Sequence, residues 1–296
     1  MSMDNLKKNA ILAPFNLLYR VSPELTLKIL FRLKVGYPLN LKHPRTYNEK
    51  LQWIKLHDRN PLMAQCCDKF AVRSYVESKG CGDYLNDLLW QGFDPAEIPF
   101  DELPERYVVK VTHGSTFNVI IDGTKPVNRD EIVQKCNKWL KAKFLPCYGE
   151  WFYGIEKPRV IVERYLENEG KGQLYDYKVF CFNGHARYVR MDVDRFTDHK
   201  MVVYDTNWNR LPGYDMGYPG GDIDFAKPDC LDELICAAER LSSEFYHARV
   251  DFYIVDSHPV LGEITFTNGA GFDRFHPDGF DCEMGDWLKL PCDEVA

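Results

Sequence analysis

The amino-acid sequence predicts an α+β protein with two lobes and a helical layer at its N-terminus. Helical periodicity dominates the first part of the chain, short apolar strands begin near residue 107, and an Asn-Gly pair joins two strand-like runs. The 296 residues are 45% apolar and 27% charged, which is typical of a soluble globular protein. We expect the helical layer over residues 1–60, the small lobe over 61–166 and the large lobe over 167–296.

The helical layer is predicted from two stretches with apolar residues at helical spacing. One stretch ends near Tyr19 and the other runs from Leu25 to Leu33. Between them, Ser22 and Pro23 resemble an N-cap followed by a proline in the first helical turn. A second helical block is predicted over residues 48–75.

The two lobes are predicted from strand signals that replace the helical pattern after Tyr107. Asn183-Gly184 is the strongest short hairpin signal in the chain. Helices are predicted over residues 129–143 and 231–245. Apolar runs predict strands over residues 107–111, 119–121, 160–162, 177–182 and 186–191.

Charge and cysteine usage limit the class of protein. A net charge of −7 argues against nucleic acid as a partner, because no basic field is available to neutralise phosphates. The ten cysteines are scattered without a C-x-x-C pair or a zinc-ligand spacing. We recognise neither a secretory signal nor an apolar run long enough to span a bilayer. We therefore expect a cytoplasmic protein in a reducing compartment.

Basic residues such as Arg20, Lys28 and Arg32 interleave with the apolar residues of the N-terminal helices. Two interpretations stay open. The helices form a layer packed on the main domain with a solvated basic face, or they lie at an interface with anionic lipid. The second interpretation predicts peripheral contact with a membrane.

The segment 248–269 is typical of two short apolar strands that each carry a carboxylate, Asp251 and Glu263. With a turn of three or five residues around Ser257, the two side chains lie directly opposite each other, at roughly 5 Å, where like charges are destabilising. The usual compensation for two carboxylates in an apolar hairpin is a divalent cation. An even-numbered turn would instead leave one carboxylate buried and the other solvated.

Other charged and polar residues follow in an order that is more specific than any of them alone. Asp68 and Lys69 open a helix-like stretch, and Lys110 lies near the end of a strand. The order continues with the polar turn 112–116, the strand and charged connector 158–167, the Asp176-Tyr177-Lys178 start of the Asn-Gly hairpin, and then Arg249, Asp251 and Glu263.

This order resembles the ATP-grasp superfamily over residues 61–275. Within that superfamily the chain is similar to the TupA-like group, which is associated with capsule and teichuronopeptide polysaccharide synthesis. The resemblance implies an ATP-grasp fold of two α+β lobes with ATP between them, and ATP and Mg²⁺ as cofactors. The segments that carry the closer resemblance are 55–62, 68–73, 113–115, 176–184 and 262–267.

The resemblance also implies roles for residues of the small lobe. Lys69 and Lys110 would hold the ATP phosphates as point charges. His113, Ser115 and Thr116 would close over the phosphates, with backbone N–H groups in a concave nest. Backbone groups of a hinge strand would recognise adenine by hydrogen bonds. This strand comprises Glu163, Arg164, Tyr165 and Leu166.

In the large lobe, the resemblance places Asp176 near ribose and Lys178 near a phosphate. Arg195 is a further catalytic candidate, which would help to clamp an anionic glycan or else lie on a solvated hairpin face. Each residue has a plain structural alternative. Lys110 is then a solvated lysine near a strand end, and Lys178 pairs with Asp176 in a purely structural way.

Asp251 and Glu263 would bind Mg²⁺ bridging the phosphates. The superfamily usually supplies a third ligand from an asparagine two residues after the glutamate. Here Thr265 occupies that position and the nearest asparagine is Asn268, so both are candidates. Arg249 lies on the same face as Asp251 and would stabilise charge on the transferred phosphoryl group or on the tetrahedral adduct.

ATP-grasp enzymes generally activate a carboxylate as an acyl phosphate and pass the acyl group to an amine or another nucleophile, which releases ADP and phosphate. Phosphorylation supplies the leaving group that a carboxylate lacks, and nearby cations neutralise the developing charge. The closer resemblance implies a ligase that joins a uronic acid carboxylate, in a polysaccharide or its sugar precursor, to an amino acid or related amine.

Two other functions stay open. An ATP-dependent glycan kinase would phosphorylate a hydroxyl group at the same ATP site. A metal-dependent glycosyltransferase would use a D-x-D triplet, and such triplets stand at 192–194 and 222–224. Lys69, Lys110 and Lys178 suit a triphosphate better than a sugar diphosphate.

Overall fold

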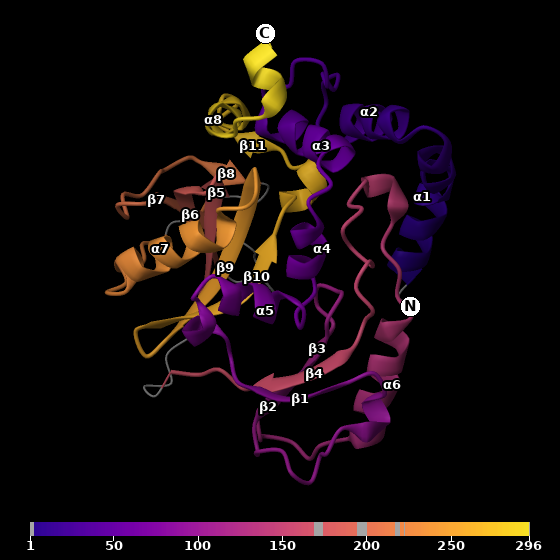
Figure 1. Ribbon diagram of the computed structural model, residues 1–296, viewed down its shortest axis with the longest axis vertical. Helices are drawn as coiled ribbons and strands as arrows, with labels where there is room; N and C mark the ends of the chain where they lie inside the picture. Colours follow the sequence, from indigo (N-terminus) through magenta and orange to yellow (C-terminus); the bar gives the residue numbers. More distant parts are fainter. Residues whose placement is uncertain (1–2, 169–173, 194–199, 217–219, 222, 296) are drawn as a thin grey trace.

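The computed structural model describes residues 3–168, 174–193, 200–216, 220–221 and 223–295 (Figure 1). The α-helices are α1 (Met3–Val21), α2 (Pro23–Lys34), α3 (Tyr47–His57), α4 (Pro61–Cys67), α5 (Val72–Ser78), α6 (Arg129–Leu140), α7 (Leu231–Ser242) and α8 (Phe280–Trp287). The strands are β1 (Leu88–Gly92), β2 (Tyr107–Val111), β3 (Asn118–Ile121), β4 (Val160–Arg164), β5 (Asp176–Phe182), β6 (His185–Val193), β7 (Lys200–Asp205), β8 (Asp215–Met216), β9 (His247–Val255), β10 (His258–Thr265) and β11 (Phe275–His276).

The N-terminal helices α1 and α2 form the predicted layer at the edge of the molecule (Figure 1). Leu27, Leu30 and Phe31 of α2 are buried against Phe272, which comes from the far end of the chain. Pro23 begins α2 as expected, but the Ser22 side chain makes no capping hydrogen bond. Among the described residues, no helix is both long enough and apolar enough to cross a bilayer.

The helical block predicted over residues 48–75 is divided into α3, α4 and α5. The first break follows from Asn60, whose side-chain oxygen accepts a hydrogen bond from the Leu62 N–H at 3.1 Å and caps α4. Pro61 then occupies the first position of the new helix, where its missing N–H costs nothing. The segment after α4 brings Asp68 and Lys69 close to the small sheet, where the Lys69 N–H donates to the Thr112 carbonyl at 3.2 Å.

The small sheet is antiparallel with strand order β1-β4-β2-β3. Val109 and Val162 are fully buried, and Ile132 and Cys136 of α6 pack in the same core. The sequence predicted β2, β3, β4 and α6, whereas β1 was missed. Its segment, Leu88–Gly92, is short and bends at a bulge between Leu88 and Trp90, so it has no clear alternating pattern.

The large sheet is also antiparallel, with strand order β10-β9-β5-β6-β7. Helix α7 packs against β5, β6 and β9, and its Leu234 and Leu241 share a core with Val179 and Val250 of the sheet. Because successive strand residues point to opposite faces, the neighbours of these valines face away from α7. Those neighbours include the charged residues of the candidate site.

The β5–β6 and β9–β10 hairpins of the large sheet each turn through two residues. Asn183-Gly184 confirms the predicted turn, and Asp256-Ser257 likewise has two residues at positive φ. The turn at Ser257 is therefore even-numbered, the alternative that was expected to leave one carboxylate buried and the other solvated. A bulge at Gly262 nevertheless inserts one extra residue in β10, and this shift pairs Glu263 with Asp251.

Candidate active site

Four charged residues form a row across the large sheet. Glu263 on β10 pairs with Asp251 on β9, Asp251 pairs with Lys178 on β5, and Lys178 pairs with Arg190 on β6. Directly paired residues share one face of a sheet. The row therefore places two negative charges beside two positive charges, on the face opposite α7.

Lys178 is nearly fully buried in the middle of this row. Its Nζ donates to the Asp176 carboxylate and to Asp251 Oδ2, the latter at 3.0 Å, and lies 3.6 Å from Asp192 Oδ2. The predicted structural pairing with Asp176 is thus present, within a larger cluster of carboxylates. A buried ammonium group needs such partners, because burial of an isolated charge is very costly.

Arg249 brings the two opposed carboxylates together. Its Nε and Nη2 each donate to Asp251 at 2.7 Å, and Nη2 also donates to Glu263 Oε1 at 3.1 Å. The same guanidinium donates to Thr265 Oγ1 at 3.2 Å and to Asn268 Oδ1 at 2.6 Å. All four predicted metal ligands therefore contact one arginine, whose charge compensates the carboxylate pair.

These charges fix the ionisation of Asp251. Burial alone would raise the pKa of Asp251, but Arg249 and Lys178 outweigh burial and hold that pKa at about 2. The pKa of Arg249 is raised, although burial opposes it, mainly through the charge of Asp251. The pair thus stays ionised throughout the neutral range.

Two cations of the small lobe, Lys69 and Lys110, lie near each other, and Lys69 lies near the row. Lys110 Nζ lies 2.6 Å from Glu163 Oε2, and Lys69 Nζ donates to the Gly114 carbonyl at 2.6 Å. Burial lowers the pKa of Lys69, whereas Glu263 of the large sheet opposes that effect and Lys110 of the small sheet adds to it. Lys69 therefore lies within electrostatic reach of both sheets.

The polar turn after β2 is divided between two environments. Ser115 and Thr116 are exposed at its tip, where Thr116 has a φ of 64°. His113 is buried instead, its Nε2 lies 3.1 Å from the Ala142 carbonyl, and burial lowers its pKa. His113 thus faces the loop after α6 rather than the tip of the turn.

The predicted hinge strand is shorter than expected. Strand β4 ends at Arg164, so Tyr165 and Leu166 lie beyond it. The Arg164 N–H donates to the Asp87 carbonyl at 3.0 Å, and its own carbonyl accepts from Asn86 at 2.9 Å. Among the residues predicted to read adenine, Arg164 thus has its backbone groups engaged within the protein.

Several residues near the site were missed or lie outside the description. Arg190 and Asp192 were not assigned to the predicted ATP site, although the Asn-Gly turn places that part of β6 beside Lys178. Asp273, which accepts a hydrogen bond from Asn268, follows a short 3₁₀ turn that has no sequence periodicity. Arg195 lies outside the described residues.

The fold and the charges of the two lobes are those of an ATP-grasp enzyme. The sequence matches the TupA-like ATPgrasp family over residues 49–289, and the chain belongs to this family. Membership confirms the predicted fold class and the predicted enzyme class, an ATP-grasp ligase. ATP and Mg²⁺ are the cofactors of such enzymes, as the sequence analysis expected. No curated protein matches the sequence significantly.

Solved ATP-grasp ligases have similar structures at low sequence identity. D-alanine–D-alanine ligase from Bacillus anthracis, complexed with ATP, is 16% identical with a TM-score of 0.46, covering 78% of this chain and 67% of that chain. Phosphoribosylamine–glycine ligase from Thermotoga maritima is 13% identical with a TM-score of 0.43, and the match covers 69% of this chain and 48% of that chain. The ATP-grasp ligase PsnB, complexed with Mg and ADP, is 12% identical with a TM-score of 0.44, and the match covers 81% of this chain and 64% of that chain.

Proposed function

We propose that this protein is an ADP-forming carboxylate–amine ligase that modifies a uronic-acid-containing cell-surface polysaccharide, or its precursor, with an amino acid or amine. The observation that carries the proposal is the position of Lys69, whose N–H donates to the Thr112 carbonyl beside the small sheet and whose ammonium lies within electrostatic reach of Glu263 and of Lys110. Cations on one lobe and acidic oxygens on the other are what a metal-bound triphosphate requires.

The donor set around Arg249 fits Mg²⁺, because it consists of carboxylate, hydroxyl and amide oxygens. Asp251 and Glu263 would hold the ion, with Thr265 or Asn268 as a further ligand. The Glu263 side chain is 43% exposed and the Asp251 side chain only 3%, so Glu263 is the accessible ligand. When bound, the ion would neutralise phosphate charge.

The proposed reaction has two steps. An oxygen of the uronate carboxylate attacks the γ-phosphorus, the bond to the bridging oxygen breaks, and ADP leaves an acyl phosphate behind. The amine nitrogen then attacks the acyl carbon and loses a proton, and inorganic phosphate departs. Lys69, Lys178 and Arg249 would stabilise the negative charge that develops on the phosphoryl and acyl oxygens.

The site favours a ligase or kinase over a glycosyltransferase. Asp192 of the first D-x-D triplet is buried, with Arg190 Nε 3.2 Å from its Oδ1, so it is poorly placed to bind a nucleotide-sugar metal. Asp194 of that triplet and Asp222 of the second lie outside the described residues. A kinase would use the same ATP site and is distinguished by its product.

Phosphorus NMR of the protein with Mg-ATP, a uronic acid oligosaccharide and an amino acid pool tests the proposal. We expect ADP and phosphate only with the uronate, and a hydroxamate when hydroxylamine is added. Glu263→Ala should abolish turnover, whereas Glu233→Ala, whose side chain is similarly exposed (44%) on α7, should not. A phosphorylated sugar would identify a kinase instead, and no ATP turnover with any uronate would refute the proposed acceptor.

We also propose peripheral contact with an anionic membrane or with capsule-synthesis machinery. Apolar side chains of α1 and α2 remain exposed beside basic residues, with Ile11 at 68%, Leu17 at 66% and Val21 at 81%. Co-sedimentation with anionic vesicles, but not with neutral ones, is the expected result. Equal recovery of the wild type and of Leu17→Ser/Val21→Ser in the pellet would contradict contact through these helices.

A further inference from the structure

A cavity of about 510 Å³ lies beside the polar turn 112–116. Tyr19 of α1, His113 of the turn and the loop from Leu140 to Pro158 contribute to its lining. The N-terminal layer holds this loop in place, since the Asn16 side chain accepts a hydrogen bond from the Cys147 N–H at 3.0 Å. Its volume is within the range of small-molecule sites.

The inner wall of the cavity adjoins the segment that follows β10, the strand that carries Glu263. Glu150 in this wall accepts a hydrogen bond from Thr267 Oγ1, just after the end of β10. Tyr153, in the same wall, is within electrostatic reach of Glu263 and Arg249. A molecule in the cavity therefore lies next to the place where the proposed function puts the reacting phosphate.

The remaining wall combines a flat apolar surface with positive charge. The rings of Phe144 and Tyr153 are stacked at 4.4 Å between centroids, with an interplanar angle of 12°. Lys141 and Lys143 are exposed at the rim. Such a stack suits the C–H face of a sugar ring, and the two lysines suit carboxylates of a charged glycan.

Two buried nitrogen atoms in this wall also lack partners. Among the described residues, His113 Nδ1 and Trp151 Nε1 have no hydrogen-bond partner. Buried polar atoms are rarely left unsatisfied, and those that are call for an explanation such as a ligand or water. A sugar hydroxyl group can accept a hydrogen bond from Trp151 Nε1 and donate one to His113 Nδ1, because the ring proton of His113 lies on Nε2 toward the Ala142 carbonyl.

We propose that this cavity is the acceptor subsite and that it binds the uronic acid unit. The sugar ring would lie on the outer face of Phe144, which Tyr153 supports from the other side, and carboxylates of adjoining sugar units would meet Lys141 and Lys143. This inference rests on the proposed function and specifies which part of the protein recognises the sugar.

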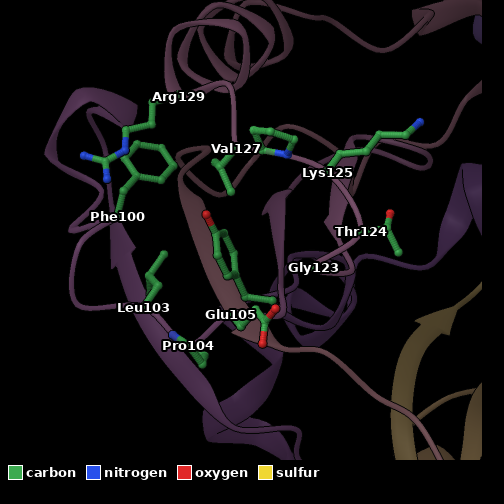
Figure 2. Close-up of a pocket in the computed structure, with 11 residues that line it drawn as sticks. Phe100, Leu103, Pro104, Glu105, Gly123, Thr124, Lys125, Val127 and Arg129 are labelled. Atoms are coloured by element: carbon green, nitrogen blue, oxygen red, sulfur yellow. The ribbon is translucent and has the colours of Figure 1, made fainter.

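A second cavity of about 460 Å³ provides an internal control (Figure 2). It lies on the small lobe, and Phe100, Lys125 and Arg129 line it. Arg129 is already paired with Asp101, and no predicted site residue contributes to this lining. Lysines near this cavity therefore match Lys141 and Lys143 in charge and exposure, but they do not lie beside the polar turn 112–116.

The test compares Lys141→Ala/Lys143→Ala with the control Lys125→Ala/Lys135→Ala, which removes two exposed lysines from the same lobe. Calorimetric titration with trigalacturonic acid should show affinity about tenfold weaker for the first variant, and unchanged for the control. Maltotriose, which carries no charge, should bind both variants equally. Phe144→Leu should weaken trigalacturonate binding at unchanged charge, because it removes the ring.

The readouts separate failure of the subsite from failure of the proposed function. If uronate supports turnover but both double variants show the same KM for it, the subsite proposal is wrong and the function stands. If turnover fails but trigalacturonate binding depends on Lys141 and Lys143, the subsite stands and the reaction is wrong. Absence of trigalacturonate binding by the wild type would overturn the subsite directly.

Discussion

Lys178 and Lys55 are both buried, yet they have opposite kinds of partners. Lys178, in the large sheet, is surrounded by the carboxylates of Asp176, Asp192 and Asp251. Lys55, on α3, donates instead to the backbone carbonyls of Tyr148 at 2.7 Å and Ala270 at 2.8 Å. Its ammonium group also lies 4.6 Å from the centre of the Phe272 ring.

The difference shows that the partner determines what a buried lysine does. Carbonyls and an aromatic ring only partly replace water, and burial lowers the pKa of Lys55 to about 7 against the opposing charge of Glu150. Lys55 thereby joins α3 to the segments at Tyr148 and Ala270, and so positions the loop that carries the cavity. Lys178 lies in a charged row and is suited to contact a phosphate.

The largest difference should follow from removing each ammonium group. Lys178→Met leaves three buried carboxylates with one fewer cation, so we expect a loss of about 3–5 kcal/mol in the free energy of unfolding. Chemical denaturation measures this loss. Lys178→Arg should recover most of it, because the charge is kept. If Lys178→Met and Lys55→Met lowered the free energy of unfolding equally, the buried carboxylates would not need the charge of Lys178 for their stability.

A second difference concerns pH. In the folded state the pKa of Lys55 is about 7, below its usual value of 10.5, so the unfolded chain binds more protons between these values. The free energy of unfolding should therefore rise with pH in this window, by about 2 kcal/mol between pH 7 and 9 from this group. The window ends at 9 because burial raises the pKa of thiols such as Cys181, which reverses the slope above it.

This pH effect is measured as the difference between the wild type and Lys55→Met in denaturation curves at several pH values. Subtraction removes the contribution of the cysteines, which both proteins share. A difference that stays constant from pH 7 to 9 would show that Lys55 titrates as an exposed lysine does.

The two lysines also show how far sequence reasoning reaches. Asp251 and Glu263 were found because strand alternation is local and places residues on a face without knowledge of the rest, whereas Lys178 was found through the family resemblance. The pairing of Glu263 with Asp251 was expected for the wrong reason, since it depends on a bulge at Gly262 rather than on an odd turn. At Gly262 a Cβ would lie 3.2 Å from the Asp251 carbonyl oxygen, a packing restriction that no pattern reveals.

Lys55 was not distinguished from a surface lysine, because its partners are 93 and 215 residues away. Glu150 was missed for a similar reason, since the loop around it has no periodicity and its neighbours come from α3 and the end of β10. Strands and local faces were thus predictable, whereas bulges and contacts between distant loops were not. The residue roles inferred from the family resemblance, including the metal ligands, stay predictions.

The smallest expected effects separate a structural lysine from a functional one. At pH 7, Lys55→Met should lower the free energy of unfolding by only about 1 kcal/mol. The substitution loses hydrogen bonds to two carbonyls, but it also removes a buried charge that is itself destabilising. Since Lys55 contacts none of the predicted ATP-binding residues in the described structure, the KM for ATP should change less than twofold. Lys178→Arg keeps the charge but alters the geometry, and steady-state kinetics should show a raised KM for ATP. If Lys55→Met raised that KM as much as Lys178→Arg does, the loop held by Lys55 would be part of nucleotide binding, and the division drawn between the two lysines would fail.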